Sequence, residues 1–141
     1  MIVGPGEGRT FTIGPQVARV KAEGEGGPAV VETRLPPKAG APRHRHHDHD
    51  ETFYVLAGTL EVDVDGTRRV LGPGGLARAP RGTAHGFRNP GPGDALVLAL
   101  YDPSPSLAYL EQLGDALAAG EDARRDAALA DLYARFATEP A

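Results

Sequence analysis

The chain has 141 residues, 40% of them hydrophobic, and a formal net charge of −4 at pH 7. This length suits one domain with a hydrophobic core, and the mildly acidic charge balance argues against a nucleic-acid-binding surface. We expect a soluble cytoplasmic protein, because no apolar run is as long as a membrane span and the first residues lack the basic and hydrophobic regions of a signal peptide.

Residues 9–101 predict an all-β fold of short strands separated by many Gly and Pro residues. The predicted strands are Arg9–Ile13, Val17–Ala22, Ala29–Leu35, Glu51–Leu56, Thr59–Asp65, Thr67–Leu71, Leu76–Ala79, His85–Arg88 and Ala95–Tyr101. Within Thr59–Asp65, apolar and acidic residues alternate with the period of two that is typical of a half-buried strand. Asp65-Gly66 then supplies the residue pair favoured in a tight hairpin turn. Gly24–Pro28 and Pro36–Pro42 are predicted to be loops.

The pattern changes after Tyr101 and predicts two helices. Ser104-Pro105 resembles a helix cap followed by proline in the first helical position, and Gly120 is the expected stop. Glu121 and Asp122 would open the second helix. The apolar positions at helical spacing are Leu107, Leu110, Leu113 and Leu117, then Leu129, Leu132, Tyr133 and Phe136. We expect a β domain at residues 1–103 and a helical extension at 104–139. The helices would pack on a sheet face or a partner subunit, with a lid over the barrel mouth as the alternative.

The types of side chain in the sequence leave histidine and carboxylate groups as the candidates for catalysis or metal binding. The chain has no cysteine, which excludes disulfides, thiolate nucleophiles and Cys-based zinc sites. Its two serines, Ser104 and Ser106, lie in a proline-rich turn without a Gly-x-Ser-x-Gly pattern, and its two lysines lie outside any phosphate-binding glycine-rich loop. Four of the five histidines, in contrast, fall between positions 44 and 49.

The histidine-rich segment predicts a group of metal ligands. In an extended strand, His44 and His46 project from the same face and can aim two imidazoles at one point. The polar stretch 47–50 is long enough to reverse the chain, so Glu51 would face the two histidines from the next strand. Phe53 and Val55 share the face of Glu51 and would line an apolar interior around it.

A second segment adds a further ligand. Pro80 and Gly82 mark a turn, after which His85 starts a strand with Phe87 on its own face. Three imidazoles and one carboxylate make a mixed nitrogen and oxygen shell. Such a shell suits Fe(II), Mn(II), Ni(II), Cu(II) or Zn(II) better than calcium or magnesium.

These two segments resemble the motifs of the cupins. His44-x-His46, four residues, Glu51, six residues and Gly58 follow the first motif over residues 40–58, except that Gly40 precedes His44 by three residues where the family has five. The second motif, residues 74–89, is matched by Gly74, Pro80, Gly82, His85 and Asn89. The resemblance implies a double-stranded β-helix, or jelly-roll barrel, and a homodimer. It also implies one divalent transition metal ion held by His44, His46, Glu51 and His85.

Several alternatives remain open at the level of the sequence. Residues 44–49 are also compatible with a solvated loop that binds metal adventitiously, and His47 and His49 are interpreted as turn residues. Asn89 and Gly82 are expected to form turns. The apolar side chains of the predicted strands are expected to form the core. Some of them would also contact a substrate if one enters the barrel, and the candidates for this contact are Phe53, Val55, Val62 and Phe87.

The function expected from this combination is a metal-dependent enzyme with a small-molecule substrate. Similarity to small quercetin-dioxygenase-like cupins suggests an oxidoreductase acting on a small enol, phenol or diketone. Glu51 would then serve as both ligand and proton acceptor. One alternative is a non-oxidative isomerase, cyclase or decarboxylase, and another is a non-catalytic cupin that binds a small molecule. Neither nucleic acid nor a membrane is an expected partner.

Overall fold

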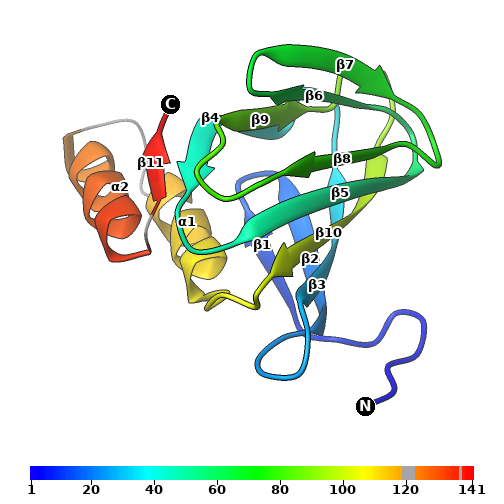
Figure 1. Cartoon of the computed structure of the whole chain (residues 1–141), viewed down its shortest axis with the longest axis horizontal. Helices are drawn as coiled ribbons and strands as arrows, with labels where there is room; N and C mark the ends of the chain where they lie inside the picture. The colour runs from blue at the N-terminus through cyan, green and yellow to red at the C-terminus, as the bar shows by residue number, and fades with distance from the viewer. Residues whose placement is uncertain (119–122, 137) are drawn as a thin grey trace.

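Two antiparallel β-sheets face each other and enclose the apolar interior of the chain (Figure 1). The computed structural model describes residues 1–118, 123–136 and 138–141. One sheet has the order β1 (Thr10–Ile13), β2 (Gln16–Ala22), β3 (Ala29–Leu35), β10 (Ala95–Asp102), β5 (Asp50–Ala57), β8 (Leu76–Ala79). The other has the order β11 (Thr138–Pro140), β4 (Gly40–His46), β9 (His85–Arg88), β6 (Leu60–Val64), β7 (Thr67–Leu71). The predicted all-β jelly roll is confirmed.

The predicted strands form with ends that agree to within one residue, and the structure adds two more. The prediction of a loop at Pro36–Pro42 is wrong over its last residues, because strand β4 begins at Gly40. This strand has no aliphatic alternation, since its inward positions carry imidazoles. Strand β11 is also absent from the predicted strands. It is only three residues long and includes a proline, so its sequence carries no strand signal.

The core lies between the two sheets. The largest fully buried side chains there are those of Leu35, Phe53, Val55 and Leu60. They come from alternate positions of their strands, which is what a period of two produces when one face of a sheet is buried. The hairpin predicted at Asp65-Gly66 joins β6 to β7, and both residues have positive φ angles, 51° and 85°. The prediction of a tight turn at this pair is confirmed.

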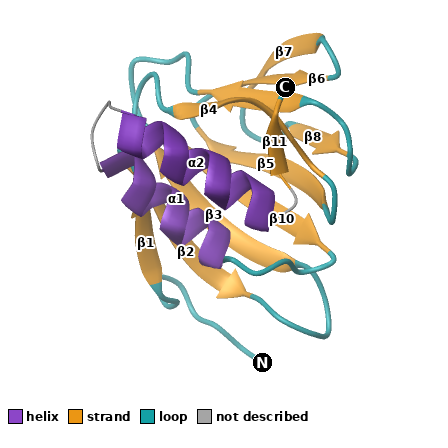
Figure 2. Cartoon of the chain, turned by 90° about the vertical axis from the view of Figure 1, so that its left-hand side faces the viewer, coloured by secondary structure: helices purple, strands orange, loops and turns teal. Residues whose placement is uncertain are grey.

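The two helices, α1 (Ala108–Ala118) and α2 (Ala123–Arg135), lie side by side across the barrel, as Figure 2 shows. Leu107 and Leu110 pack with Phe11 into a second apolar cluster built on β2, β3 and β10. Helix α1 approaches strand β1 so closely that a Cβ added at Gly114 would collide with the carbonyl oxygen of Thr12. The expectation that the helices pack on a sheet face therefore holds for α1.

The start of the first helix differs from the prediction. Ser104 does not cap it: the Ser104 hydroxyl instead accepts a hydrogen bond from the Gly24 backbone N–H at 2.8 Å. The helix begins at Ala108, whose N–H donates to the hydroxyl of Ser106 at 3.4 Å. The residues between the end of β10 and Ala108 let the chain cross from the sheet to the first helix. The predicted helix stop at Gly120, the predicted start at Glu121 and Asp122, and the side chain of Leu117 lie outside the described residues.

Strand β11 returns the chain to the barrel and pairs with β4 (Figure 1). Without it, β4 would be the edge of its sheet, with unpaired backbone groups. The end of the described chain is thus laid directly against the strand that carries His44 and His46. Among the described residues, no helix is both long enough and apolar enough to cross a membrane.

Candidate metal centre

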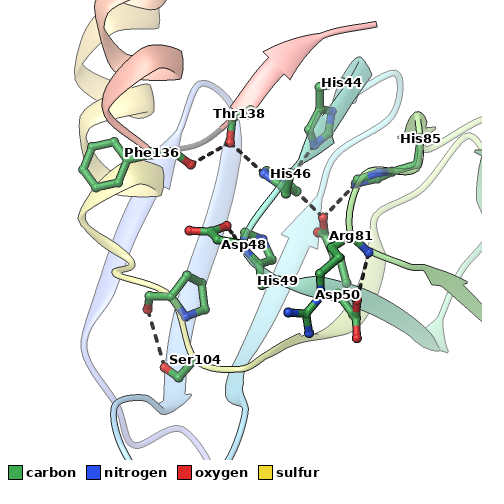
Figure 3. A network of polar contacts seen from close by, with 12 residues as sticks. His44, His46, Asp48, His49, Asp50, Arg81, His85, Ser104, Phe136 and Thr138 are labelled. Carbon is green, nitrogen blue, oxygen red and sulfur yellow. Dashed lines mark hydrogen bonds and ion pairs between the residues drawn. The ribbon is translucent and has the colours of Figure 1, made fainter.

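The structure brings the four predicted ligands together in the barrel interior. His44 and His46 come from β4, Glu51 from β5 and His85 from β9, and one potential ligand atom of each lies within 4.8 Å of all the others. His44 Nε2 is 3.1 Å from His46 Nε2, and Glu51 Oε2 is 2.9 Å from His85 Nε2 and 3.4 Å from His46 Nε2. Figure 3 shows the side chains of His44 and His46 from β4 and of His85 from β9 converging.

Strand pairing explains this convergence. His44 and His46 project from one face of β4 because they are two residues apart. Strand β9 is the antiparallel neighbour of β4, and its register places His85 directly opposite His44. Glu51 stands near the start of β5 in the facing sheet, where it is buried on the same face as Phe53 and Val55. The carboxylate therefore meets the imidazoles across the interior of the barrel.

The outer nitrogen of each histidine is already hydrogen bonded. Nδ1 of His44 is 2.8 Å from the Pro42 carbonyl oxygen, and Nδ1 of His85 is 2.9 Å from the Thr83 carbonyl oxygen. A carbonyl only accepts, so both Nδ1 atoms carry hydrogen. The neutral His44 ring therefore presents the lone pair of Nε2 to the centre. Nε2 of His85 instead donates to the Glu51 carboxylate, and it presents a lone pair once that hydrogen is lost. His46 Nδ1 has its partner in the hydroxyl of Thr138, at 2.8 Å. Metal-binding histidines are typically oriented in this way.

The electrostatics of the centre also suit a cation. Burial by itself raises the pKa of Glu51, but its contacts with His46 and His85 outweigh burial and hold that pKa well below its usual range. Burial lowers the pKa of His44 to about 4. For His85, burial works toward a lower pKa, yet the Glu51 carboxylate leaves it raised. Glu51 is therefore ionised and His44 neutral at pH 7, and these are the protonation states that metal ligands need.

A cavity of about 370 Å³ adjoins these ligands and is lined in part by His44, His46 and Glu51. Most of the wall is apolar or aromatic. The barrel contributes Phe53, Leu60 and Phe87, and the helices contribute Leu110, Leu113 and Leu129. Since side chains of α1 and α2 line the cavity, the helical extension both packs on the sheet and encloses the space beside the ligands.

The four predicted substrate-contacting residues fall into two pairs. Phe53 and Phe87 line the cavity. Val55 and Val62 instead lie in the closely packed cluster between the sheets and are not among the residues that line it. All four point inward, as the alternation predicts, but tertiary packing decides which of them face open space.

The two remaining histidines of the segment have different environments. His47 is exposed, with Nε2 3.4 Å from a carboxylate oxygen of Glu139. His49 is buried, stacks on His46 with ring centroids 4.3 Å apart, and places Nδ1 2.6 Å from Asp48 Oδ1. Its Nε2 is also buried and finds no hydrogen-bond partner among the described residues. His49 is thus a cavity-lining residue as well as the turn residue that its position predicts.

Three further residues of the site have no motif that identifies them. Tyr101 and Tyr109 are buried and line the cavity, and Tyr109 meets the ring of His46 edge-on at 6.0 Å. Tyr101 could have been placed inside from the alternation along Ala95–Tyr101, which buries every second residue. Thr138 contacts His46 from 92 residues away, and no local pattern signals that contact.

Comparison with known proteins gives one family and several relatives. A family model described as a cupin domain matches residues 31–101. Quercetin 2,3-dioxygenase of Bacillus subtilis (strain 168) is 41% identical over 86 residues, which cover 59% of this chain and 26% of that protein. The pectin degradation protein KdgF of Dickeya dadantii (strain 3937) is 36% identical over 54 residues, or 38% of this chain and 49% of that one. The chain thus matches half or less of the length of these relatives.

Solved structures agree with the fold. KdgF from a Halomonas species superposes with a TM-score of 0.69 and 26% sequence identity, covering 75% of this chain and 96% of that one. An RmlC-like cupin from Shewanella frigidimarina superposes with a TM-score of 0.65 at 22% identity, covering 74% and 92% of the two chains. The regions compared extend beyond the histidine-containing motifs.

Proposed function

The chain belongs to the cupin family, and on that premise we propose that it is an enzyme that depends on one divalent transition metal ion. One observation carries the proposal: ligand atoms of His44, His46, Glu51 and His85 lie within 4.8 Å of one another beside a cavity. The buried carboxylate is ionised and the three imidazoles turn their Nε2 atoms toward one point, so the donor set fits Fe(II), Mn(II), Ni(II), Cu(II) or Zn(II).

The reaction that we favour is a dioxygenase-type oxidation of a small enol, phenol or diketone. An ion with four protein ligands supplies Lewis acidity and open positions for a chelating substrate and, if it is redox-active, for dioxygen. Quercetin 2,3-dioxygenase is among the relatives. Glu51 would accept a proton from the substrate hydroxyl, because its carboxylate is ionised and borders the cavity.

The cavity wall supports a substrate with an apolar body. Its volume of about 370 Å³ is in the range of small-molecule sites. Leu110, Leu113 and Leu129 would exclude water from one side of a bound ring, while Phe53 and Phe87 would contact it from the barrel. Polar groups gather at the metal ligands, so an oxygen-bearing edge of the substrate would point there.

A non-oxidative metal enzyme, such as an isomerase, cyclase or decarboxylase, is the second candidate. It is favoured by the similarity to KdgF, which is a pectin degradation protein in Dickeya dadantii and whose Halomonas structure is matched over 96% of its length. A non-catalytic cupin that binds a small molecule is the remaining alternative. Oxygen uptake by the iron-loaded protein with a panel of phenols, enols and diketones separates the first candidate from the other two.

We also propose that the protein is a homodimer. Tyr54 on β5 and Leu76 on β8 are paired across the two strands and are 37% and 55% exposed. These apolar side chains give the outer face of the sheet a surface that a second copy can cover. The expected cytoplasmic location stays a prediction.

The metal site is tested by measuring bound metal in the untagged protein, in a His85→Ala variant and in a His47→Ala variant. We expect close to one ion per chain in the parent and in His47→Ala, because His47 is exposed and lies outside the ligand group. His85→Ala should lose the ion although residues 44–49 are intact. If His85→Ala retains the metal and His47→Ala loses it, the loop binds metal adventitiously and the proposed centre is wrong.

A further inference from the structure

We propose that Thr138, in the C-terminal strand β11, is a positioning residue for the metal centre: its hydroxyl fixes the tautomer of His46 so that Nε2 faces the other ligands. This inference rests on the proposed metal-binding function. It assigns a role in the centre to a segment outside residues 31–101, which are the part of the chain matched by the family model.

The contacts form a short chain of hydrogen bonds. His46 Nδ1 is 2.8 Å from Thr138 Oγ1, and Thr138 Oγ1 is 3.1 Å from the Phe136 carbonyl oxygen. Figure 3 shows Thr138 between the Phe136 carbonyl and His46, joined to each by a dashed line, with His46 on the side toward the other ligands. Both His46 and Thr138 are buried, at 4% and 5% exposure, so water does not compete for these partners.

The donor and the acceptor of each of these hydrogen bonds follow from the chemistry of the groups. A carbonyl oxygen can only accept, so the Thr138 hydroxyl donates its hydrogen to Phe136. The hydroxyl oxygen is then available to accept, and His46 Nδ1–H donates to it. A neutral imidazole with hydrogen on Nδ1 has its lone pair on Nε2. In His46 this is the nitrogen that lies 3.1 Å from His44 Nε2 and 3.4 Å from Glu51 Oε2.

His46 differs in this respect from the other two histidines of the centre. His44 and His85 donate to the carbonyl oxygens of Pro42 and Thr83, each two residues earlier in its own strand or turn. His46 relies on a residue 92 positions away. Its orientation therefore depends on the docking of β11, whereas the orientation of His44 and His85 is determined locally.

Strand pairing holds Thr138 in place. The antiparallel register sets Thr138 opposite His46 and Glu139 opposite Arg45. Ala141 N–H donates to the Arg43 carbonyl oxygen at 3.0 Å, and Arg45 forms an ion pair with Glu139 at 3.2 Å. These contacts allow the hydroxyl and the strand to be tested separately, since Glu139 helps to dock β11 without contacting His46.

The test compares the affinity of Co²⁺ for the full-length parent, Thr138→Val, Thr138→Ser and Glu139→Gln, measured by competition with a chromophoric chelator. Valine keeps the branched shape and removes the hydroxyl, so Thr138→Val should bind Co²⁺ about 10- to 100-fold more weakly. Thr138→Ser restores the hydroxyl and should bind with nearly the parent's affinity, as should Glu139→Gln. Parent-like affinity in Thr138→Val, or equal weakening in Thr138→Ser or Glu139→Gln, would overturn the proposal.

A second measurement needs neither metal nor a variant. The ¹⁵N chemical shifts of the His46 ring in the metal-free parent report its tautomer, and we expect hydrogen on Nδ1. Hydrogen on Nε2 alone, with none on Nδ1, would overturn the role of Thr138 even if Thr138→Val failed to fold. If the tautomer is as expected but the parent binds no Co²⁺, the proposed metal-binding function is wrong, and with it the positioning role.

Discussion

Nε2 of His85 lies 2.9 Å from Oε2 of Glu51, and this contact joins strand β9 of one sheet to strand β5 of the other. Both groups are buried, at 2% and 3% exposure. The pKa of the imidazole is raised and that of the carboxyl is lowered, so each group stabilises the charged form of its partner. The contact between His85 and Glu51 thus links the two sheets across the barrel.

Replacing Glu51 with glutamine should lower the pKa of His85 in the metal-free protein. Burial of His85 works toward a lower pKa, and the Glu51 carboxylate is the main group that raises it. With that charge removed, burial remains, and we expect the pKa to fall below the ordinary 6.5. An NMR titration of the His85 ring measures this. Asp50→Asn is the control, because Asp50 pairs with Arg81 and should leave the pKa of His85 unchanged.

His44 should make the metal-free protein sensitive to acid. Its pKa is lowered from 6.5 to about 4 in the folded state, mainly by burial. As pH falls through this window the unfolded chain takes up a proton before the native state does, so the free energy of unfolding decreases. Protonation of His44 alone should lower the free energy of unfolding by about 3 kcal/mol at most.

The comparison that isolates this effect uses His44→Asn, which cannot take up the proton. Urea unfolding of the parent and the variant in chelator, at about pH 7 and about pH 4.5, should show a smaller loss of stability in the variant. Equal losses in the two proteins would mean that His44 is not the acid-sensitive group.

His49→Phe should leave the metal content unchanged. The variant keeps a ring that can stack on His46, and His49 is not one of the four converging ligands. The variant loses the contact between Nδ1 and the half-exposed Asp48 carboxylate, but it also removes a buried Nε2 that has no partner among the described residues, so the net loss of stability should be small. Metal analysis and thermal melting check both points, and loss of metal from a folded variant would place His49 among the ligands.

Val55→Ala should lower the free energy of unfolding by about 2 kcal/mol, because it removes two methyl groups from a fully buried position. Metal affinity should not change. Val17→Ala makes the same substitution at a residue that is 42% exposed, and should change stability by no more than about 0.5 kcal/mol. Chemical denaturation of both variants gives the comparison, and a small effect at Val55 would show that its site relaxes or is hydrated.

Most of the barrel is predictable because its strands alternate between apolar and polar residues. Strand β4 is the instructive exception: its inward positions carry His44 and His46, so the chemistry of the site removes the hydrophobic pattern that normally reveals a strand. The spacing of those same residues, two apart, nevertheless predicts that they share a face. The four-residue centre is therefore predictable from the sequence, even though the loop predicted at Pro36–Pro42 overlaps the start of β4.

The rest of the site depends on contacts between distant parts of the chain. Val55 and Phe53 both face inward, yet only Phe53 borders the cavity, because the packing of the facing sheet fills the space beside Val55. Thr138 meets His46 only once β11 has paired with β4. Neither outcome is encoded in the spacing of neighbouring residues.

Gly114 has a consequence for how this architecture can diversify. At this position α1 contacts the backbone of Thr12, and there is no room for a Cβ between them. The distance between α1 and the barrel is therefore set by a residue without a side chain. Even an alanine at this position would lift or tilt the helix. One small substitution outside the ligand group can thus change the shape of the cavity. The size of the molecules that the cavity admits can therefore change in evolution while the four metal ligands stay the same.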